Sequence, residues 1–124
     1  MSKKQKNVLG GDLELCSSNP LTGWYRDGCC NTDDNDNGLH TVCAKVNSDF
    51  LEWCKSSGND LVTPRPEFGF PGLKDGDNWC VCATWFARAV EAGKECKIYL
   101  KKTNEKTLKI IPLEILKKHS IDLS

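Results

Sequence analysis

The sequence is 124 residues long, and its 17 basic and 17 acidic side chains give no net charge at pH 7. A chain of this length forms one domain that buries roughly two-thirds of the surface exposed by the unfolded state. Because the opposite charges cancel, the chain lacks the positive excess on which non-specific binding to nucleic acid or anionic membranes depends. Composition therefore does not favour a nucleic-acid-binding protein.

The N-terminal lysines resemble the start of a signal peptide, but Asp12 and Glu14 stand where such a peptide needs an apolar stretch. No apolar run in the sequence approaches the length of a membrane-spanning helix. We therefore expect a cytoplasmic protein with no membrane partner. In that compartment the eight cysteines are expected to be thiols, metal ligands or transient redox pairs rather than a permanent disulfide framework.

The N-terminal part of the chain divides into a tail and a long irregular segment. Residues 1–6 are polar and are predicted to be a disordered tail, which leaves residues 7–124 as the single domain. Residues 7–37 are rich in Gly, Asn and Asp and have neither the helical nor the strand period, so they predict an irregular packed segment. The alternating pattern from Leu39 to Val46 then predicts the first strand.

Two helices are predicted in the middle of the chain. Ser48 as N-cap and Gly58 as stop predict a short helix from about Asp49 to Ser57. A second helix is predicted from about Cys80 to Ala92, because apolar residues recur there at helical spacing and Gly93 follows.

A proline-rich loop, TPRPEFGFPGLKDGDNWCVC from Thr63 to Cys82, precedes and leads into the second helix. Its prolines fix φ and push the residues before them toward extended conformations, so the loop should be stiff. Long loops in compact domains are often functional, and the aromatic residues of this one argue against a solvated linker. We expect the loop to form part of the site.

The C-terminal third predicts a hairpin and a last helix. Residues 97–101 and 108–110 alternate around a Thr-Asn-Glu-Lys turn, and Pro112 is suited to a first helical position. Together the elements predict an α+β fold: a single compact domain with a small antiparallel sheet or hairpin, two to three short helices and long irregular segments.

Cys80 and Cys82 carry the sharpest chemical signal. A thiol near a helix N-terminus is stabilised as a thiolate by backbone N–H groups and by the helix dipole, so either cysteine could be a nucleophile, with His40 or His119 as its base. If residues 79–82 are extended, both sulfurs point to one face. The alternative is that both are small buried hydrophobic residues.

Several soft ligands could instead hold a tetrahedral zinc ion. His40 and Cys43 cannot share an ion if both lie within one strand, unless the strand begins after His40. An adjacent Cys29–Cys30 disulfide would be a labile redox switch. The metal candidates, which match no paired CxxC spacing, are Cys29, Cys30, His40, Cys43, Cys80 and Cys82, with Cys16 as a further soft ligand.

The acidic run from Asp33 to Gly38 matches the first half of a calcium-binding loop, but Ala44 stands where the bidentate glutamate is needed. We interpret this run as a solvated turn rich in Asp and Asn.

Charged residues in two glycine- or proline-bracketed loops suggest a ligand site. Arg26 with Asp27, and Arg65 with Glu67, could form an anion-binding or acid/base site near Cys80, because arginine offers a planar fork of donors. The alternative is that these charges pair with each other or with backbone groups and only hold the loops in place.

Four stretches, NVLGGDLELCSSNPLTGWYRDGCCNT, GLHTVCA, GNDLVTPRPEFGFPGLKDGDNWCVCA and PLEILKKH, resemble in that order a family of small, mostly bacterial proteins known as the domain of unknown function number twenty-two thirty-seven. The resemblance spans about residues 7–119. It implies a stand-alone intracellular domain without an established activity. Residues matching its motifs add Asp60 and Trp79 to the candidate ligand-binding set, which becomes Arg26, Asp27, Asp60, Arg65, Glu67 and Trp79.

From these observations we expect a polar, cysteine-lined pocket that binds a small-molecule ligand or a metal such as zinc. The first alternative is a thiol-dependent enzyme with Cys80 or Cys82 as nucleophile. The second alternative is a structural or partner-docking module in which the cysteines are core residues. Ligand identity, catalytic role and oligomeric state are left open by the sequence.

Overall fold

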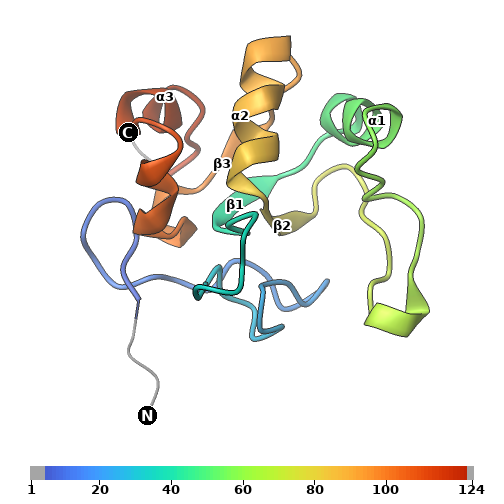
Figure 1. The fold of residues 1–124 in the computed structure, drawn as a ribbon, viewed down its shortest axis with the longest axis horizontal. Coiled ribbons are helices and arrows are strands. Elements are labelled where there is room, and N and C mark those ends of the chain that lie inside the picture. Colours follow the sequence, from blue (N-terminus) through green and yellow to red (C-terminus); the bar gives the residue numbers. More distant parts are fainter. Residues whose placement is uncertain (1–4, 123–124) are drawn as a thin grey trace.

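A computed structural model describes residues 5–122 of the chain and confirms the α+β class (Figure 1). It has three strands, β1 (Val42–Lys45), β2 (Asn78–Val81) and β3 (Lys97–Ile98), and three α-helices, α1 (Ser48–Ser56), α2 (Ala83–Ala92) and α3 (Leu113–Lys118). The remaining described residues form short 3-10 turns and long irregular segments. No helix in residues 5–122 is long and apolar enough to cross a membrane.

The three strands form one antiparallel sheet in the order β2-β1-β3, so that β2 is an edge strand. Cys43 of β1 lies opposite Cys80 of β2. Figure 1 shows the three helices on one side of the sheet and the irregular N-terminal segment on the other. Because side chains alternate along a strand, β1 directs Val42 and Ala44 into the core beside the helices and Cys43 into a second, smaller buried cluster.

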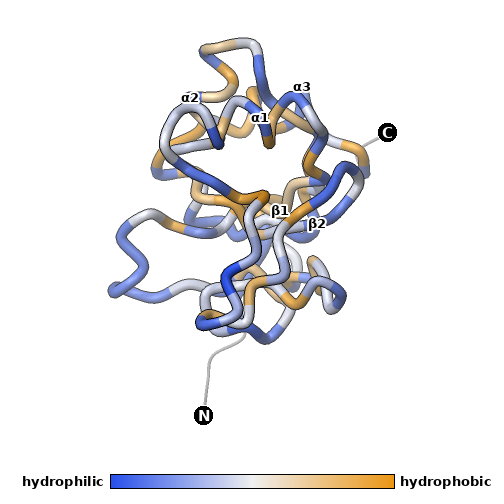
Figure 2. The backbone as a smooth tube through the Cα atoms, turned by 90° about the vertical axis from the view of Figure 1, so that its right-hand side faces the viewer, coloured by the Kyte–Doolittle hydropathy of each residue, from blue (hydrophilic) through white to orange (hydrophobic). Residues whose placement is uncertain are grey.

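The larger core lies between the sheet and the helices. Phe50 of α1, Phe86 of α2 and Leu116 of α3 are fully buried there together with Ile98 of β3. Figure 2 shows apolar positions of the chain gathered in the strands at the centre of the molecule. The helices are thus held mainly by their apolar faces, as expected for helices of this length, which are marginal in isolation.

The middle elements begin later than the sequence predicted. The second helix starts at Ala83 rather than Cys80, because residues 78–81 pair with β1 and are therefore extended. The first strand starts at Val42 rather than Leu39. The first helix is close to its prediction, with Asn47 instead of Ser48 as the N-cap: its side chain accepts a hydrogen bond from the Phe50 N–H at 2.7 Å.

The predicted hairpin of residues 97–101 and 108–110 is wrong. Only Lys97 and Ile98 form a strand, and 3-10 turns follow at Leu100–Lys102 and Glu105–Lys109. The physical reason is that polar side chains between these turns are buried and bonded elsewhere. Asn104 donates to the Cys30 carbonyl at 3.1 Å, and the Thr103 hydroxyl accepts from the Cys43 N–H at 3.1 Å. Period-2 alternation does not reveal such partners.

The irregular course predicted for residues 7–37 is confirmed, since no helix or strand forms there. The segment begins within the domain: the Gln5 side chain exchanges two hydrogen bonds with the backbone of Thr32. Gln5 and Lys6 are therefore part of the packed structure, while residues 1–4 of the predicted tail lie outside the described residues.

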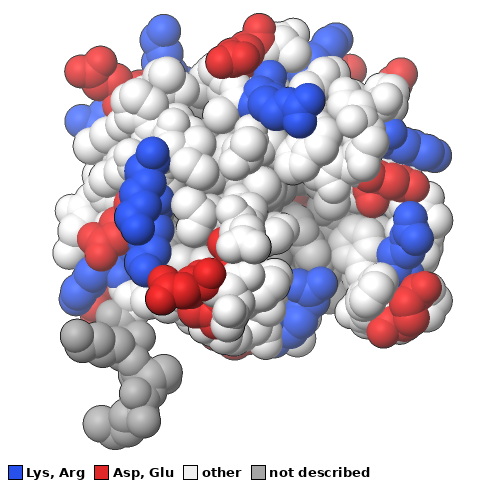
Figure 3. Space-filling view, viewed as in Figure 1, with Lys and Arg blue, Asp and Glu red and all other residues white. Residues whose placement is uncertain are grey.

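Acidic and basic side chains are interspersed over the face of the molecule shown in Figure 3, without a large patch of either sign. This distribution agrees with the balanced composition. On this face a charged ligand would meet a few positioned groups rather than a broad field of one sign.

Candidate ligand pocket and cysteine cluster

A cavity of about 480 Å³ lies at the outer edge of β2. It is bounded by residues from the N-terminal segment, the turn before β1, the proline-rich loop, β2 and the start of α2. The volume falls in the range typical of small-molecule sites. Of the six candidate ligand-binding residues, four line this cavity: Arg26, Asp60, Arg65 and Trp79.

Aromatic side chains form much of the cavity wall. Phe70 and Trp79 meet edge to face, with ring centroids 5.1 Å apart. Trp24 and Phe68 line the same cavity and remain 40% and 70% exposed. Exposed aromatic rings around a cavity offer flat apolar surface for stacking on a ligand.

The two arginines of the pocket carry positive charge from opposite loops. The Arg26 guanidinium donates to the Gly23 carbonyl at 2.7 Å and lies 5.2 Å from the centre of the Trp79 ring. Arg65 is fixed by its backbone, which exchanges two hydrogen bonds with Phe70. Within residues 5–122 no ion pair joins either arginine to a carboxylate. Both guanidinium groups therefore retain donors for an anion.

The partners suggested for these arginines lie elsewhere. The Asp27 carboxylate accepts from the Cys29 N–H at 3.0 Å and from the Asn31 side chain at 2.9 Å. Glu67 sits in the 3-10 turn Pro66–Phe68 and is exposed. The structure does not bring Asp27 or Glu67 to the lining of the pocket that holds Arg26 and Arg65.

Asp60 shapes the proline-rich loop. Its carboxylate accepts from the Thr63 hydroxyl at 2.6 Å, from the Val62 N–H at 2.9 Å and from the Thr63 N–H at 3.1 Å. The Thr63 hydroxyl bond, followed by the two backbone bonds, lowers the pKa of Asp60 to about 2. A carboxylate held ionised in this way is a turn-forming group rather than a general acid at neutral pH.

His40 faces the pocket from the turn before β1. Its Nδ1 lies 2.6 Å from Asp36 Oδ1, and the Asp36 side chain is fully buried whereas the His40 side chain is 41% exposed. The Trp24 ring stacks on the imidazole with centroids 5.8 Å apart. Buried Asp36 also accepts from the His40 N–H and the Thr32 hydroxyl, both at 2.9 Å, so the carboxylate fixes both the ring and its backbone.

Cys82 is the N-cap residue of α2 and lines the same pocket. Its thiol donates to the Gly38 carbonyl at 2.8 Å. A Cβ built on Gly38 would lie 3.1 Å from the Cys82 sulfur and 3.4 Å from Cε1 of His40, so both side chains flank this glycine. The absence of a side chain at residue 38 leaves the thiol and the imidazole in one recess.

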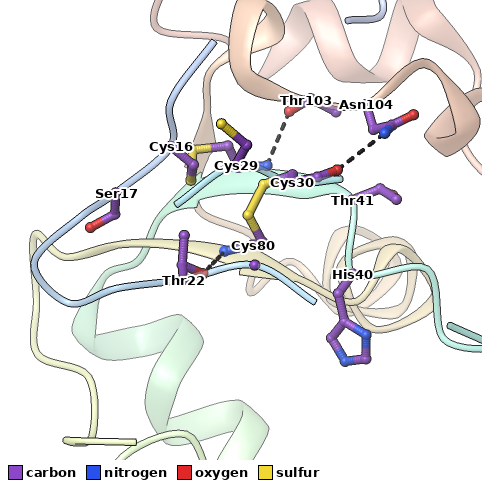
Figure 4. Close-up of a disulfide and its surroundings, with 12 residues drawn as sticks. Cys16, Ser17, Thr22, Cys29, Cys30, His40, Thr41, Cys80, Thr103 and Asn104 are labelled. Atoms are coloured by element: carbon purple, nitrogen blue, oxygen red, sulfur yellow. Dashed lines mark hydrogen bonds between the residues drawn. A yellow bond between two sulfur atoms is a disulfide. The ribbon is translucent and has the colours of Figure 1, made fainter. Parts of the chain in front are cut away.

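Four other cysteines form two disulfides, Cys16–Cys43 and Cys30–Cys80 (Figure 4). The sequence led us to expect thiols, metal ligands or transient redox pairs rather than a permanent disulfide framework, and it did not indicate these two pairings. Residue register explains the difference: Cys43 and Cys80 are cross-strand neighbours, and each faces a cysteine of the irregular segment packed on that side of the sheet. The cellular compartment expected from the sequence does not indicate which cysteines lie close enough to bond.

The metal candidates are consequently divided between two places. Cys30, Cys43 and Cys80 lie in the buried cluster with Cys16, and His40 and Cys82 lie in the pocket. Figure 4 shows His40 pointing away from the disulfide. Cys29 is half-buried and not part of a disulfide. The strand does begin after His40, but the histidine turns to Asp36 and the pocket rather than to the sulfur cluster.

The residual cysteines and the second histidine are outside the pocket. Cys54 and Cys96 are buried in the larger core, and burial raises the pKa of each thiol to about 12. His119 lies next to Phe86 and 3.9 Å from Glu95. His119 therefore does not serve Cys80 or Cys82 as a base, and Cys80 is held in a disulfide.

Sequence reasoning did not assign Trp24 or Phe68 to the pocket lining, and it missed Asp36, which contacts His40 from outside that lining. Asp36 lies in the run that we interpreted as a solvated turn, yet its side chain is fully buried. Its four-residue spacing from His40 was a usable signal for an Asp–His pair.

The fold and the pocket define a small α+β domain with an aromatic, arginine-bearing cavity beside a disulfide-linked core. A family model described as an uncharacterized protein conserved in bacteria, DUF2237, matches residues 6–120. The chain belongs to this family, as its motifs indicated. No curated protein matches the chain.

Proposed function

We propose that this protein binds a small anionic ligand with a planar apolar group in the cavity beside β2. The observation that carries the proposal is the convergence of two arginines and several aromatic rings, from loops distant in sequence, on one cavity. The cavity lining holds two positively charged guanidinium groups but only one carboxylate, that of Asp60. The Asp60 oxygens already accept hydrogen bonds from its own turn, so an anionic ligand would meet more positive than negative charge.

The geometry supports a division of roles. Trp79 is 6% exposed and is covered by Arg26 and Phe70, so it holds the arginine in place. The exposed rings of Trp24 and Phe68 offer the surface against which a planar group can pack. Arg65 lines the same cavity from the proline-rich loop. Hydrogen bonds from a guanidinium to an anion are stronger than neutral ones and fix ligand orientation.

The test uses two fluorescent probes with the same naphthylamine core: 1-anilinonaphthalene-8-sulfonate, which is an anion, and N-phenyl-1-naphthylamine, which is neutral. We expect the Arg65→Gln variant to bind the anionic probe about tenfold more weakly, because a hydrogen bond to a charged group contributes about 1.5–3 kcal/mol. Binding of the neutral probe should change little. Fluorescence titration measures both affinities.

Lys102→Gln is the matched control, because it also removes a cation that lies over an aromatic ring, 4.4 Å from the centre of the Tyr99 ring, and neither Lys102 nor Tyr99 lines the pocket. It should leave both affinities unchanged. The proposal fails if the wild-type protein binds neither probe, or if Arg65→Gln weakens the two probes equally.

A second candidate function, metal binding, is favoured by the sulfur cluster. The sulfurs of Cys16, Cys30 and Cys80 lie within 4.8 Å of one another, and Cys43 is bonded to Cys16. We propose that after both disulfides are reduced, each gaining two electrons and two protons from a dithiol, the four thiolates can hold one zinc ion as the thiol protons leave.

Cobalt(II) added to the anaerobically reduced protein tests this candidate, since tetrahedral cobalt thiolates absorb strongly in the visible. One cobalt per chain is expected, displaced by zinc. Cys80→Ser should remove the absorption, whereas Cys29→Ser should preserve it because Cys29 lies outside the cluster. Absence of the band in reduced wild type, or its persistence in Cys80→Ser, contradicts this ligand set.

A further inference from the structure

Cys82 and His40 line the pocket, and the buried carboxylate of Asp36 contacts His40 from outside the lining. Ligand binding alone requires none of these three groups. Cys82, His40 and Asp36 come from the N-cap of α2 and from the turn before β1. The Asp36–His40 contact of 2.6 Å orients the imidazole through Nδ1. Nε2 is then the nitrogen available to take a proton, as in other nucleophile–base–carboxylate arrangements.

We infer that Cys82 is a catalytic nucleophile served by His40 as general base, with Asp36 as the positioning residue, and that its substrate is an acyl compound carrying an anionic planar group. The substrate class rests on the proposed ligand-binding function. The nucleophile itself does not, because it follows from the three side chains and their placement.

The resting arrangement explains how the thiol is held before reaction. Cys82 donates its proton to the Gly38 carbonyl at 2.8 Å, and Gly38 has no side chain to separate the thiol from the imidazole. In the proposed reaction, rotation about the Cys82 side-chain bond turns the thiol from the Gly38 carbonyl toward His40. The N-terminus of the ten-residue helix α2 stabilises the thiolate that forms.

The backbone around this recess is also specialised. Leu39, between Gly38 and His40, has φ 52°, a left-handed conformation that side-chain-bearing residues rarely adopt. The Ala83 N–H donates to the Leu39 carbonyl at 2.8 Å and so ties this turn to the first residue of α2. The strained turn and the helix start are therefore held together, which fixes the relation of His40 to Cys82.

The reaction balances without an added oxidant, reductant or metal. His40 takes the proton of the Cys82 thiol as the sulfur attacks the acyl carbon. The bond to the leaving oxygen then breaks, His40 returns the proton to that oxygen, and a thioester to Cys82 results. Water, deprotonated by His40, attacks the thioester and releases the acid, which restores the thiol.

The first test measures the nucleophile without any ligand, by the rate of iodoacetamide alkylation at neutral pH and peptide mass analysis. The Cys29→Ser background is used so that Cys82 is the one partly exposed thiol among the described residues, since Cys54 and Cys96 are buried and the others are in disulfides. Cys82 should react at least about tenfold faster than a free cysteine peptide.

His40→Ala should slow this alkylation about tenfold or more, and added imidazole should restore part of the rate, a response that a merely structural loss would not give. His119→Gln is the matched histidine control and should have no effect. Asp36→Asn should slow alkylation and remove the downfield proton resonance of the His40 Nδ1–H. The assignment of Cys82 as nucleophile is overturned if Cys82 is alkylated slowly in the Cys29→Ser protein with His40 intact, or if His40→Ala has no effect on the rate.

The second test measures the substrate class with 4-acetoxybenzoate, an anionic aromatic ester, against neutral phenyl acetate. Acetylation of Cys82 should be faster with the anion, and Arg65→Gln should remove this preference without changing iodoacetamide alkylation. Equal rates for the two esters overturn the anionic substrate and the proposed function together, while fast alkylation would leave the nucleophile in place. The two failures are thereby distinguished.

Discussion

Replacing Cys30 and Cys80 together by alanine is expected to lower the free energy of unfolding of the oxidised protein by about 4 kcal/mol. The two residues are 50 positions apart, so their disulfide removes a large amount of conformational freedom from the unfolded chain. It also joins β2 to the irregular segment, which has no helix or strand of its own to hold it on the sheet. Urea unfolding without reductant measures the difference.

The corresponding Cys16→Ala and Cys43→Ala pair serves as the comparison. Its separation of 27 positions closes a shorter loop, so the expected loss is smaller, about 3.5 kcal/mol. In the presence of a reductant the wild-type protein should lose most of its advantage over both variants. A difference that persists undiminished in reductant would show that packing, and not the cross-link, is responsible.

A second large effect is expected for Phe86→Ala, which should destabilise the protein by about 3–5 kcal/mol. Phe86 lies on α2 with its side chain fully buried against the sheet, so its removal leaves a cavity in the larger core. Thermal and urea unfolding measure the loss.

Phe68→Ala is the same substitution at a residue that is 70% exposed in the wall of the pocket. It should change the free energy of unfolding by less than about 1 kcal/mol, because no core cavity forms. Binding of 1-anilinonaphthalene-8-sulfonate should nevertheless weaken. Equal destabilisation by the two variants would contradict the position assigned to Phe68.

The two substitutions, taken with the cysteine pairs, separate stability from ligand recognition in this domain. The disulfides and Phe86 hold the fold on opposite sides of the sheet. Arg26, Arg65 and Phe68 line the cavity from exposed loops. A variant that loses binding but keeps its unfolding transition therefore reports on the pocket itself.

Local patterns in the sequence determined the class of fold and the two longer helices. Asn47, Ser48 and the apolar stripe with Phe50 are close enough in the chain for capping and periodicity to specify α1, and Gly93 ends α2 in the left-handed conformation. The same kind of local signal placed the long irregular segment. Such features depend on neighbours within a few residues, which a sequence displays directly.

The sequence also indicated most of the polar residues of the pocket as site candidates, but it did not predict that they lie together. Arg26 and Arg65 stood out because glycines and prolines bracket them, and Cys82 because it precedes a helix. Their assembly around β2 depends on segments far apart in the chain, since Arg65 is 39 positions and Cys82 is 56 positions from Arg26.

Only the tertiary structure decided how the cysteines and acidic residues are used. Cys43 and Cys80 meet because β1 and β2 pair in one register, and each then reaches a cysteine of the irregular segment. Asp36 became the partner of His40 because the chain folds over it and buries a carboxylate that the sequence presented as one of several in a polar turn. Register and burial arise from contacts between distant residues, so the four-residue spacing of Asp36 from His40 suggests a pair but does not show that this carboxylate is the one enclosed.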